Sequence, residues 1–282
     1  MSTSDLTAAQ FADFSEVISA QLGIKMPPAK RVMLQSRLHR RLRELGIESF
    51  EEYHSRFFGD AGHRASEIEH LLNLATTNKT DFFREPEHFA VLVREALPQW
   101  LRARRSEPFR VWCAGCSTGE EAYTIAMTLL EHRTQLAFEF SVLATDVSTR
   151  VLETAMRAVY AEEHTAPIPP ALRARYLLRG RDRAAGQMRI APEVRARVKF
   201  GHLNFLAPDY GLKAAVDVVF FRNVMIYFDR PTQEMVVGRM CRHLRPGGML
   251  FTAHAETLQG LDLPLRLAGT AAYRHEPPGT PR

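Results

Sequence analysis

A glycine-rich turn followed by two glutamates is the first part of the sequence in which residue types and spacing suggest chemistry. The string VWCAGCSTGEE places Gly115 and Gly119 between an apolar run and an expected helix, which begins with Glu120 and Glu121. Glycine lets a backbone turn sharply and approach a ligand, and open α/β sheets bind ligands at the carboxyl ends of their strands. Carboxylates would repel a pyrophosphate at this turn, so the string suits a ligand with an amine and a sulfonium. A tight turn without a ligand explains the glycines about equally well.

Two cysteines in the same string, Cys113 and Cys116, imitate a thioredoxin redox motif. In that motif the cysteines stand at the N-terminus of a helix, whereas here residues 117–119 separate Cys116 from the expected helix. The third cysteine, Cys241, has no metal-ligating partner nearby in the sequence, and the histidines lack ligand spacing. We therefore expect neither redox chemistry nor a metal site.

An acidic residue, Asp146, ends the next apolar run, Phe140–Thr145. A carboxylate at the end of the second strand can accept hydrogen bonds from both ribose hydroxyls of a nucleoside. The alternative is a helix cap for the segment that begins at Ser148. Together with the glycine turn one strand earlier, nucleoside binding is favoured.

A third apolar run, Val216–Phe221, ends in Arg222 and Asn223, and Tyr227 lies four residues after Asn223. Polar groups at the end of a parallel strand would reach the same cleft as the glycine turn. An ordinary strand exit with a core tyrosine explains this segment if it is taken by itself.

The elements that must position these residues change in character near residue 109. Before it, apolar residues at helical spacing predict helices over residues 6–22, 28–45, 50–58 and 63–76. After it, strands alternate with helices, which predicts an α/β domain with a mostly parallel sheet covered on both faces. Residues 160–200 interrupt the alternation and are expected to form a small inserted subdomain of short antiparallel strands. The expected domains are a helical domain over 1–85, a linker helix over 86–108 and the sheet domain over 109–282.

Basic residues gather in two zones of a chain whose net charge is +5. Residues 25–43 hold seven basic side chains and no acidic one, and residues 157–199 hold ten basic against four acidic. Two such zones suggest an acidic partner surface, although charge runs in general are more often solvated faces.

The bulk composition is that of a globular protein, with 45% hydrophobic and 24% charged residues. No stretch approaches the roughly 20 apolar residues that a membrane span needs. The polar N-terminus lacks the apolar core of a signal peptide, and three cysteines fit a reducing compartment. We expect a cytoplasmic protein without direct membrane insertion.

Taken together, these segments resemble the CheR-type chemotaxis receptor methyltransferases, and the resemblance covers nearly the whole chain. It rests on the strings TNKTDFFRE at 77–85, STGEEAY at 117–123, ATD at 144–146 and FRNVMIYFD at 221–229. The first and last strings are highly specific. The resemblance implies a Rossmann-like methyltransferase domain that uses S-adenosyl-L-methionine and releases S-adenosyl-L-homocysteine. Cys113 and Cys116 depart from it, since small residues are expected at their positions.

The resemblance also implies roles at matching positions. The cofactor pocket would be formed by Asn78, Thr80, Arg84, Glu121, Asp146, Asn204, Phe205, Arg222 and Asn223. Asp146 would contact the ribose, and Glu121 the methionyl end or the adenosine. Arg84 and Tyr227 would face the methyl group as the catalytic residues.

The implied substrates are glutamate side chains on the acidic cytoplasmic helical bundle of methyl-accepting chemotaxis receptors. The basic helix, with Arg37, Arg40 and Arg41, is expected to recognise that bundle. In some members of the family the insertion grips a C-terminal receptor peptide. We expect a monomer that does not bind nucleic acid.

Two alternatives from other classes remain at this point. A nucleic-acid methyltransferase would suit the basic charge, but amino-group DNA methyltransferases carry an Asn/Asp-Pro-Pro-aromatic string where this chain has residues 222–225 without proline. A non-catalytic scaffold of the same fold would have lost pocket residues, whereas Asn78, Arg84, Asp146, Asn223 and Tyr227 are all present.

Overall fold

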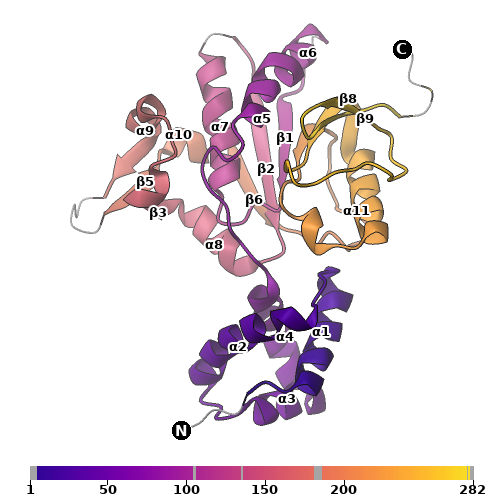
Figure 1. Cartoon of the computed structure of the whole chain (residues 1–282). Coiled ribbons are helices and arrows are strands. Elements are labelled where there is room, and N and C mark those ends of the chain that lie inside the picture. Colours follow the sequence, from indigo (N-terminus) through magenta and orange to yellow (C-terminus); the bar gives the residue numbers. More distant parts are fainter. Residues whose placement is uncertain (1–4, 104–105, 135, 181–185, 278, 280–282) are drawn as a thin grey trace. The chain divides into compact units, whose positions relative to one another are not determined.

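The computed structural model describes residues 5–103, 106–134, 136–180, 186–277 and 279, which divide into two compact units (Figure 1). The first unit comprises Met1–Thr77 with Tyr227–Asp229, and the second comprises Asn78–Ile226 with Arg230–Arg282. The division falls between Thr77 and Asn78. The helix expected to link the two domains therefore lies within the second unit.

Helices make up the described part of the first unit. They are α1 (Ala8–Leu22), the 3₁₀ turn η1 (Pro28–Lys30), α2 (Arg31–Leu45), α3 (Phe50–Gly59) and α4 (Ala61–Ala75). Local signals set their ends as the sequence predicts. Gly46 ends α2 at a φ of 66°, a conformation that glycine adopts without a steric penalty. The hydroxyl of Ser49 accepts the N–H of Glu52 at the start of α3, which satisfies a donor that has no partner within the helix.

The expected inward face of α4 is only partly right. The sequence predicts that this helix points the side chains of Ile68, Leu71, Leu72 and Leu74 inward. Leu71 is buried, but the other three are half-buried, and the helix buries Glu67 and Ala75 instead. Glu67 is buried because Arg41 donates to both of its carboxylate oxygens, at 2.9 and 2.6 Å. A pattern of apolar residues carries no signal for a buried ion pair.

A mostly parallel sheet forms the centre of the second unit. Its described strands lie in the order β6-β2-β1-β7-β8-β10-β9. Their bounds are β1 (Phe109–Ala114), β2 (Phe140–Asp146), β6 (Val198–His202), β7 (Val216–Phe220), β8 (Leu244–Phe251), β9 (Leu265–Gly269) and β10 (Ala272–His275). The first five strands in that order pair in parallel, and the last two form an antiparallel hairpin. Because β1 lies between β2 and β7, the three polar strand ends meet at one edge.

One strand of this sheet falls inside the segment expected to be wholly inserted. β6 begins at Val198 and pairs in parallel with β2, so the insertion ends before residue 198 and not at 200. The sequence does not reveal this strand, because VKFGH is short, has no continuous apolar run and follows a segment rich in arginine.

Helices cover both faces of the sheet, as expected (Figure 1). They are the continuous helix α5 (Glu87–Val91), η2 (Leu92–Ala96, a π-helical segment) and α6 (Leu97–Arg102), with α7 (Glu120–Arg133), α8 (Thr149–Arg157) and α11 (Arg230–His243). The segment from α5 to α6 places Phe89, Leu92, Leu97 and Trp100 in the core of the unit, beside residues of β1 and β7. Burial of these four apolar side chains stabilises the packing of the helix against the sheet.

The insertion contains the short antiparallel strands that the sequence predicts. They are β3 (Val159–Ala161), β4 (Leu177–Arg179) and β5 (Gln187–Ile190), in the order β3-β5-β4. The short helices η3 (Glu162–Thr165), α9 (Pro170–Tyr176) and α10 (Pro192–Arg195) accompany them. Across the described residues, no helix combines the length and hydropathy that crossing a membrane requires.

Candidate active site

The glycine turn between β1 and α7 has a backbone that only glycine fits at two positions. Gly115 has a φ of 84°, and a Cβ there would stand 2.5 Å from Cγ2 of Val224. Gly119 has a φ of 98°, and a Cβ there would stand 2.9 Å from the Cβ of Ala155. Both distances are far below van der Waals contact. The two glycines therefore let the turn pack closely between the loop after β7 and helix α8.

Asp146, at the end of β2, holds this turn in place. Its Oδ2 accepts the N–H of Ser117 at 2.8 Å, and its Oδ1 accepts the N–H of Ser148 at 3.0 Å. Burial raises the pKa of Asp146, although the hydrogen bonds from the Ser148 and Ser117 N–H groups act in the opposite direction. The carboxylate thus holds the residue before α8, although the N-cap of that helix is Ser148 and not Asp146. Each oxygen keeps further acceptor capacity for a ligand.

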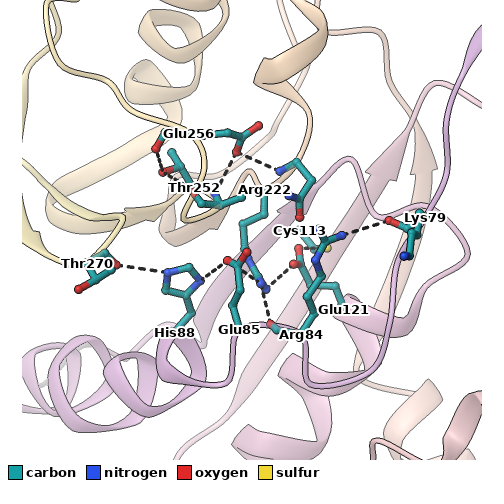
Figure 2. Close-up of polar contacts among 12 residues, drawn as sticks. Lys79, Arg84, Glu85, His88, Cys113, Glu121, Arg222, Thr252, Glu256 and Thr270 are labelled. Atoms are coloured by element: carbon teal, nitrogen blue, oxygen red, sulfur yellow. Dashed lines mark hydrogen bonds and ion pairs between the residues drawn. The ribbon is translucent and has the colours of Figure 1, made fainter.

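The segment that begins the second unit lies against the same turn. The Ser117 hydroxyl donates to the carbonyl of Asn78 at 2.8 Å, and Ser117 itself has a φ of 49°. Thr80 is half-buried in this segment. Arg84 is half-buried too, and its Nη1 lies 3.4 Å from the carbonyl oxygen of Lys79 (Figure 2). The TNKTDFFRE string and the glycine turn are therefore neighbours in space.

Arg222 lies between two glutamates at the end of β7 (Figure 2). Its Nη1 is 2.7 Å from Oε2 of Glu121, and its Nη2 is 3.0 Å from Oε2 of Glu85. Nη2 also donates to the carbonyl of Arg84 at 2.6 Å. The Arg222 side chain is only 1% exposed. A buried guanidinium needs such partners, because an unpaired buried charge is strongly destabilising.

The cysteines of the turn are buried thiols. Cys113 donates to Oε1 of Glu121 at 3.2 Å. Burial, and then the nearby carboxylates, raise the pKa of Cys113 and of Cys116 well above the ordinary thiol value. Because the thiolate is the reactive form, these side chains are poor nucleophiles and poor metal ligands.

A buried histidine lies on the other side of Glu85. His88 donates from Nε2 to the carbonyl of Thr270 at 3.3 Å, and its Nδ1 is 3.5 Å from Oε2 of Glu85 (Figure 2). Burial, assisted by the positive charge of Arg222, lowers the pKa of His88 to about 4. The ligand atoms of Glu85, His88 and His254 lie within 4.8 Å of one another. The guanidinium of Arg222 already pairs with Glu85, and its charge opposes a cation at this place.

Asn204 and Phe205 follow β6 at the same edge of the sheet. Oδ1 of Asn204 accepts the N–H of Leu206 at 2.9 Å, which shapes the turn. The ring of Phe205 is 5.1 Å from that of Phe221 in an edge-to-face contact. A Cβ on Gly115 would lie 4.0 Å from the Phe205 ring. Phe205 therefore offers an apolar surface beside the glycine turn.

Two carboxylates of this region are not identified from the sequence, the half-buried Glu85 and the buried Glu256. Glu85 pairs with Arg222, as described, and Glu256 accepts the backbone N–H of Asn223 at 3.0 Å. Glu85 is the last residue of the TNKTDFFRE string at 77–85, but that string by itself does not indicate an ion pair. Glu256 follows β8, so the rule that selects polar residues after apolar strands identifies it when applied to the fourth strand as well.

Several predicted site residues belong to the first unit. The carbonyl of Tyr227 accepts the N–H of Lys25 at 2.9 Å, and the ammonium of Lys30 lies 5.3 Å from the centre of the Tyr227 ring. Arg37 donates to the carbonyls of Leu74 and Thr76 at 2.6 and 2.7 Å.

The other two arginines of the basic helix differ from each other. Arg41 is 2.6 Å from the buried carboxylate of Glu67 and also contacts Glu44. Arg40 is exposed. Two of the three expected recognition arginines therefore make contacts that stabilise the helical unit itself.

Comparison with known proteins identifies the family. Residues 9–76 match the CheR methyltransferase all-alpha domain, and residues 78–273 match the CheR methyltransferase SAM binding domain. The chain belongs to the CheR methyltransferase family. A chemotaxis protein methyltransferase from Klebsiella aerogenes is 39% identical over 95% of this chain and 90% of the relative. Chemotaxis protein methyltransferase 2 from Pseudomonas aeruginosa is 38% identical, with 95% and 93% covered, and that of Escherichia coli is 38% identical, with 95% and 91% covered.

The cofactor of this CheR-family enzyme is S-adenosyl-L-methionine, and the second unit suits it. The carboxylates of Asp146 and Glu121 can accept hydrogen bonds or pair with positive charge, and the buried ring of Phe205 is an apolar neighbour of the glycine turn. Asn223 has a φ of 61° and Ser117 one of 49°. Such backbone strain costs about 1–3 kcal/mol per residue and gathers at ligand sites.

Proposed function

We propose that this CheR-type methyltransferase transfers a methyl group to glutamate side chains of methyl-accepting chemotaxis receptors, and that it does so in the cytoplasm as a monomer. The observation that carries the proposal is the match of both domains to one family, with similarity to chemotaxis protein methyltransferases over 95% of the chain. The receptor substrate is what the relatives' name implies. The acidic helical bundle of such receptors would complement the basic segment 25–43 of the first unit.

Methyl transfer to a glutamate needs no general base. The unperturbed pKa of a glutamate side chain is about 4.3, so at pH 7 the nucleophile is already a carboxylate. The cofactor supplies a methyl group on a sulfonium, which a carboxylate oxygen attacks in line as the sulfur takes the bonding electron pair. The products are a methyl ester and neutral S-adenosyl-L-homocysteine. Because two opposite charges vanish, exclusion of water and alignment of the reactants are the protein's main tasks.

Apart from Asn78, Thr80 and Arg84, which precede α5, the proposed cofactor residues follow the carboxyl ends of β1, β2, β6 and β7. Asp146 is proposed to accept the ribose hydroxyls with its remaining lone pairs, and Phe205 to contact the adenine. Glu121 is proposed to face the methionyl group, and Arg222 keeps its carboxylate oriented through the 2.7 Å contact. Asn78, Thr80, Asn204 and Asn223 are proposed to complete the pocket.

Arg84 and Tyr227 are the proposed catalytic residues, on the strength of the family strings that contain them. The planar guanidinium of Arg84 can orient a carboxylate through two parallel hydrogen bonds. The hydroxyl of Tyr227 can donate one hydrogen bond. Neither residue is asked to accept a proton, so both act by positioning the nucleophile.

Recognition of the receptor is proposed to use the exposed part of the basic segment. Arg31, Arg40 and Arg43 of α2 are exposed. Arg37 and Arg41, which bind the helical unit's own carbonyls and carboxylates, are proposed to set the shape of this surface. Exposed cations of this kind attract an acidic helix at long range and are screened by salt.

One experiment tests the proposal directly. The protein is incubated with methyl-labelled cofactor and with membranes that contain a chemotaxis receptor, and label is sought in the receptor. Glutamate methyl esters release methanol in mild base, whereas methylated amines and nucleic-acid bases do not. Base-stable label in nucleic acid, or label in receptor whose methylated glutamates have been replaced by alanine, would refute the proposal.

A further inference from the structure

Glu256 is a buried carboxylate behind the loop that carries Asn223. It follows β8 and is 6% exposed. Its Oε2 accepts the N–H groups of Asn223 at 3.0 Å and of Ala253 at 2.9 Å, and its Oε1 accepts that of Ile226 at 3.3 Å. One side chain therefore joins the loop after β8 to the segment 223–226.

The segment 223–226 needs such an acceptor because it leaves the sheet. After β7 ends at Phe220, the N–H groups of this segment have no neighbouring strand as partner, and buried N–H groups without acceptors are destabilising. Asn223 also has a φ of 61°, in the left-handed region that costs energy for residues other than glycine. The carboxylate holds a backbone that would otherwise relax.

The position of this segment matters to the glycine turn. Cγ2 of Val224 is so close to Gly115 that a Cβ there would stand 2.5 Å away. A shift of segment 223–226 by a fraction of an ångström therefore changes both the position of Asn223 and the packing of Val224 against the glycine turn. Interiors packed this closely transmit such shifts.

We propose that Glu256 is a positioning residue for the cofactor pocket: its carboxylate fixes segment 223–226, and through it Asn223, without touching cofactor or substrate. This rests on the proposed function only in taking Asn223 as a pocket residue. Burial raises the pKa of Glu256, with the Ala253, Asn223 and Ile226 N–H groups acting against the rise. The unfavourable desolvation of this carboxyl is therefore offset by hydrogen bonds from backbone N–H groups, including those of the segment that it positions.

The test is the affinity for S-adenosyl-L-homocysteine, measured by calorimetry on the full-length protein. Glu256→Gln keeps the size of the side chain but turns an NH₂ group toward backbone N–H donors, so affinity should fall about tenfold. The matched control is Asp217→Asn. Asp217 is another buried carboxylate, which accepts the N–H of Arg110 at 2.9 Å at the opposite end of β7. The Asp217→Asn substitution should lower the melting temperature and leave the affinity for S-adenosyl-L-homocysteine unchanged.

A double-variant cycle shows whether the effect passes through Asn223. Asn223→Gly removes the side chain while keeping the positive φ without strain. In that background, Glu256→Gln should weaken affinity by less than about threefold, because its target is gone. An unchanged affinity in Glu256→Gln alone, or an equal loss in both backgrounds, overturns the proposal.

A milder variant covers the case in which Glu256→Gln does not fold. The hydroxyl of Thr252, which is fully buried, lies 3.3 Å from the carbonyl oxygen of Glu256. Thr252→Val removes this hydrogen bond at constant shape and should weaken binding of S-adenosyl-L-homocysteine about two- to threefold. An unchanged affinity in this variant would overturn the proposal. Receptor methylation by the unmodified protein is measured separately. Its absence would contradict the proposed function, while the binding data would still decide the role of Glu256.

Discussion

Arg222 and Glu121, which are 101 residues apart in the chain, form a buried ion pair with 2.7 Å between Nη1 and Oε2. Arg222 follows β7 and Glu121 lies in the first turn of α7, so the pair exists only because β1 and β7 are neighbours in the sheet. It lies in the middle of the residues proposed to bind the cofactor. The same pair orients Glu121 and satisfies a guanidinium that water barely reaches.

Removal of one partner of this pair is expected to be more harmful than removal of both. Arg222→Gln leaves Glu85 and Glu121 without their cation and should lower the free energy of unfolding by about 3–5 kcal/mol. The double variant Arg222→Gln with Glu121→Gln should recover about 1 kcal/mol or more of that loss. Urea denaturation of the four proteins of the cycle measures this, and strict additivity would contradict a coupled pair.

Replacement of Asp146 should affect both binding and folding. Asp146→Ala removes the proposed hydrogen bonds to the ribose and should weaken binding of S-adenosyl-L-homocysteine by about 2–4 kcal/mol. It also leaves the N–H groups of Ser117 and Ser148 without their acceptor, so the melting temperature should fall. Calorimetry below that temperature separates the two effects. Unchanged affinity in a folded variant removes Asp146 from the pocket.

The exposed and the internally paired arginines of α2 should behave differently. Reversal of Arg40 and Arg43 to glutamate should raise KM for the receptor about tenfold at low salt, less at high salt, and leave cofactor affinity unchanged. Arg41→Gln should chiefly lower stability, because it leaves the buried Glu67 unpaired. If the charge reversal leaves KM for the receptor unchanged, this face of α2 is only a solvated surface.

The stability of the second unit should decline in mild acid partly on account of His88. Its pKa is lowered by burial to about 4, below the ordinary histidine value of about 6.5. The unfolded chain therefore binds a proton at a higher pH than the folded protein does. The contribution is fully present above pH 6.5 and is lost as pH falls toward 4. Denaturation between pH 7 and 4.5 should show a shallower decline in His88→Gln, and the ring signal of His88 should remain that of a neutral imidazole at pH 6.

Catalysis should be insensitive to pH over the range in which the substrate is ionised. The profile of kcat/KM should be flat from about pH 6 to 8.5 and fall only as the substrate carboxylate protonates. Tyr227→Phe and Arg84→Ala should lower kcat about tenfold or more while changing cofactor affinity less. A bell-shaped profile with an ionisation near 7 that disappears on mutation of one histidine would refute the mechanism.

The sequence by itself determined the features whose causes are local. Gly46 and Ser49 marked helix ends, because caps depend on residues a few positions apart. The alternation after residue 109 predicted the parallel sheet, and the strings around Arg84 and Asn223 predicted the family, which the domain matches confirm. Gly115 and Asp146 were predicted at strand ends, and the N–H of Gly115 donates to the carbonyl of Thr145, the residue before Asp146.

Only the tertiary structure decided which charges meet. Arg222 with Glu85 and Glu121, Glu256 with the segment 223–226, and Arg41 with Glu67 are pairings between distant parts of the chain. Their energy comes from burial next to a particular partner, and burial depends on strand order and helix packing, which a pattern of residue types does not contain. For the same reason the inward face of α4 and the strand β6 were mistaken. In α4 the inward residue is the charged Glu67, which only its partner Arg41 makes stable there, and in β6 only the pairing with β2 identifies the strand.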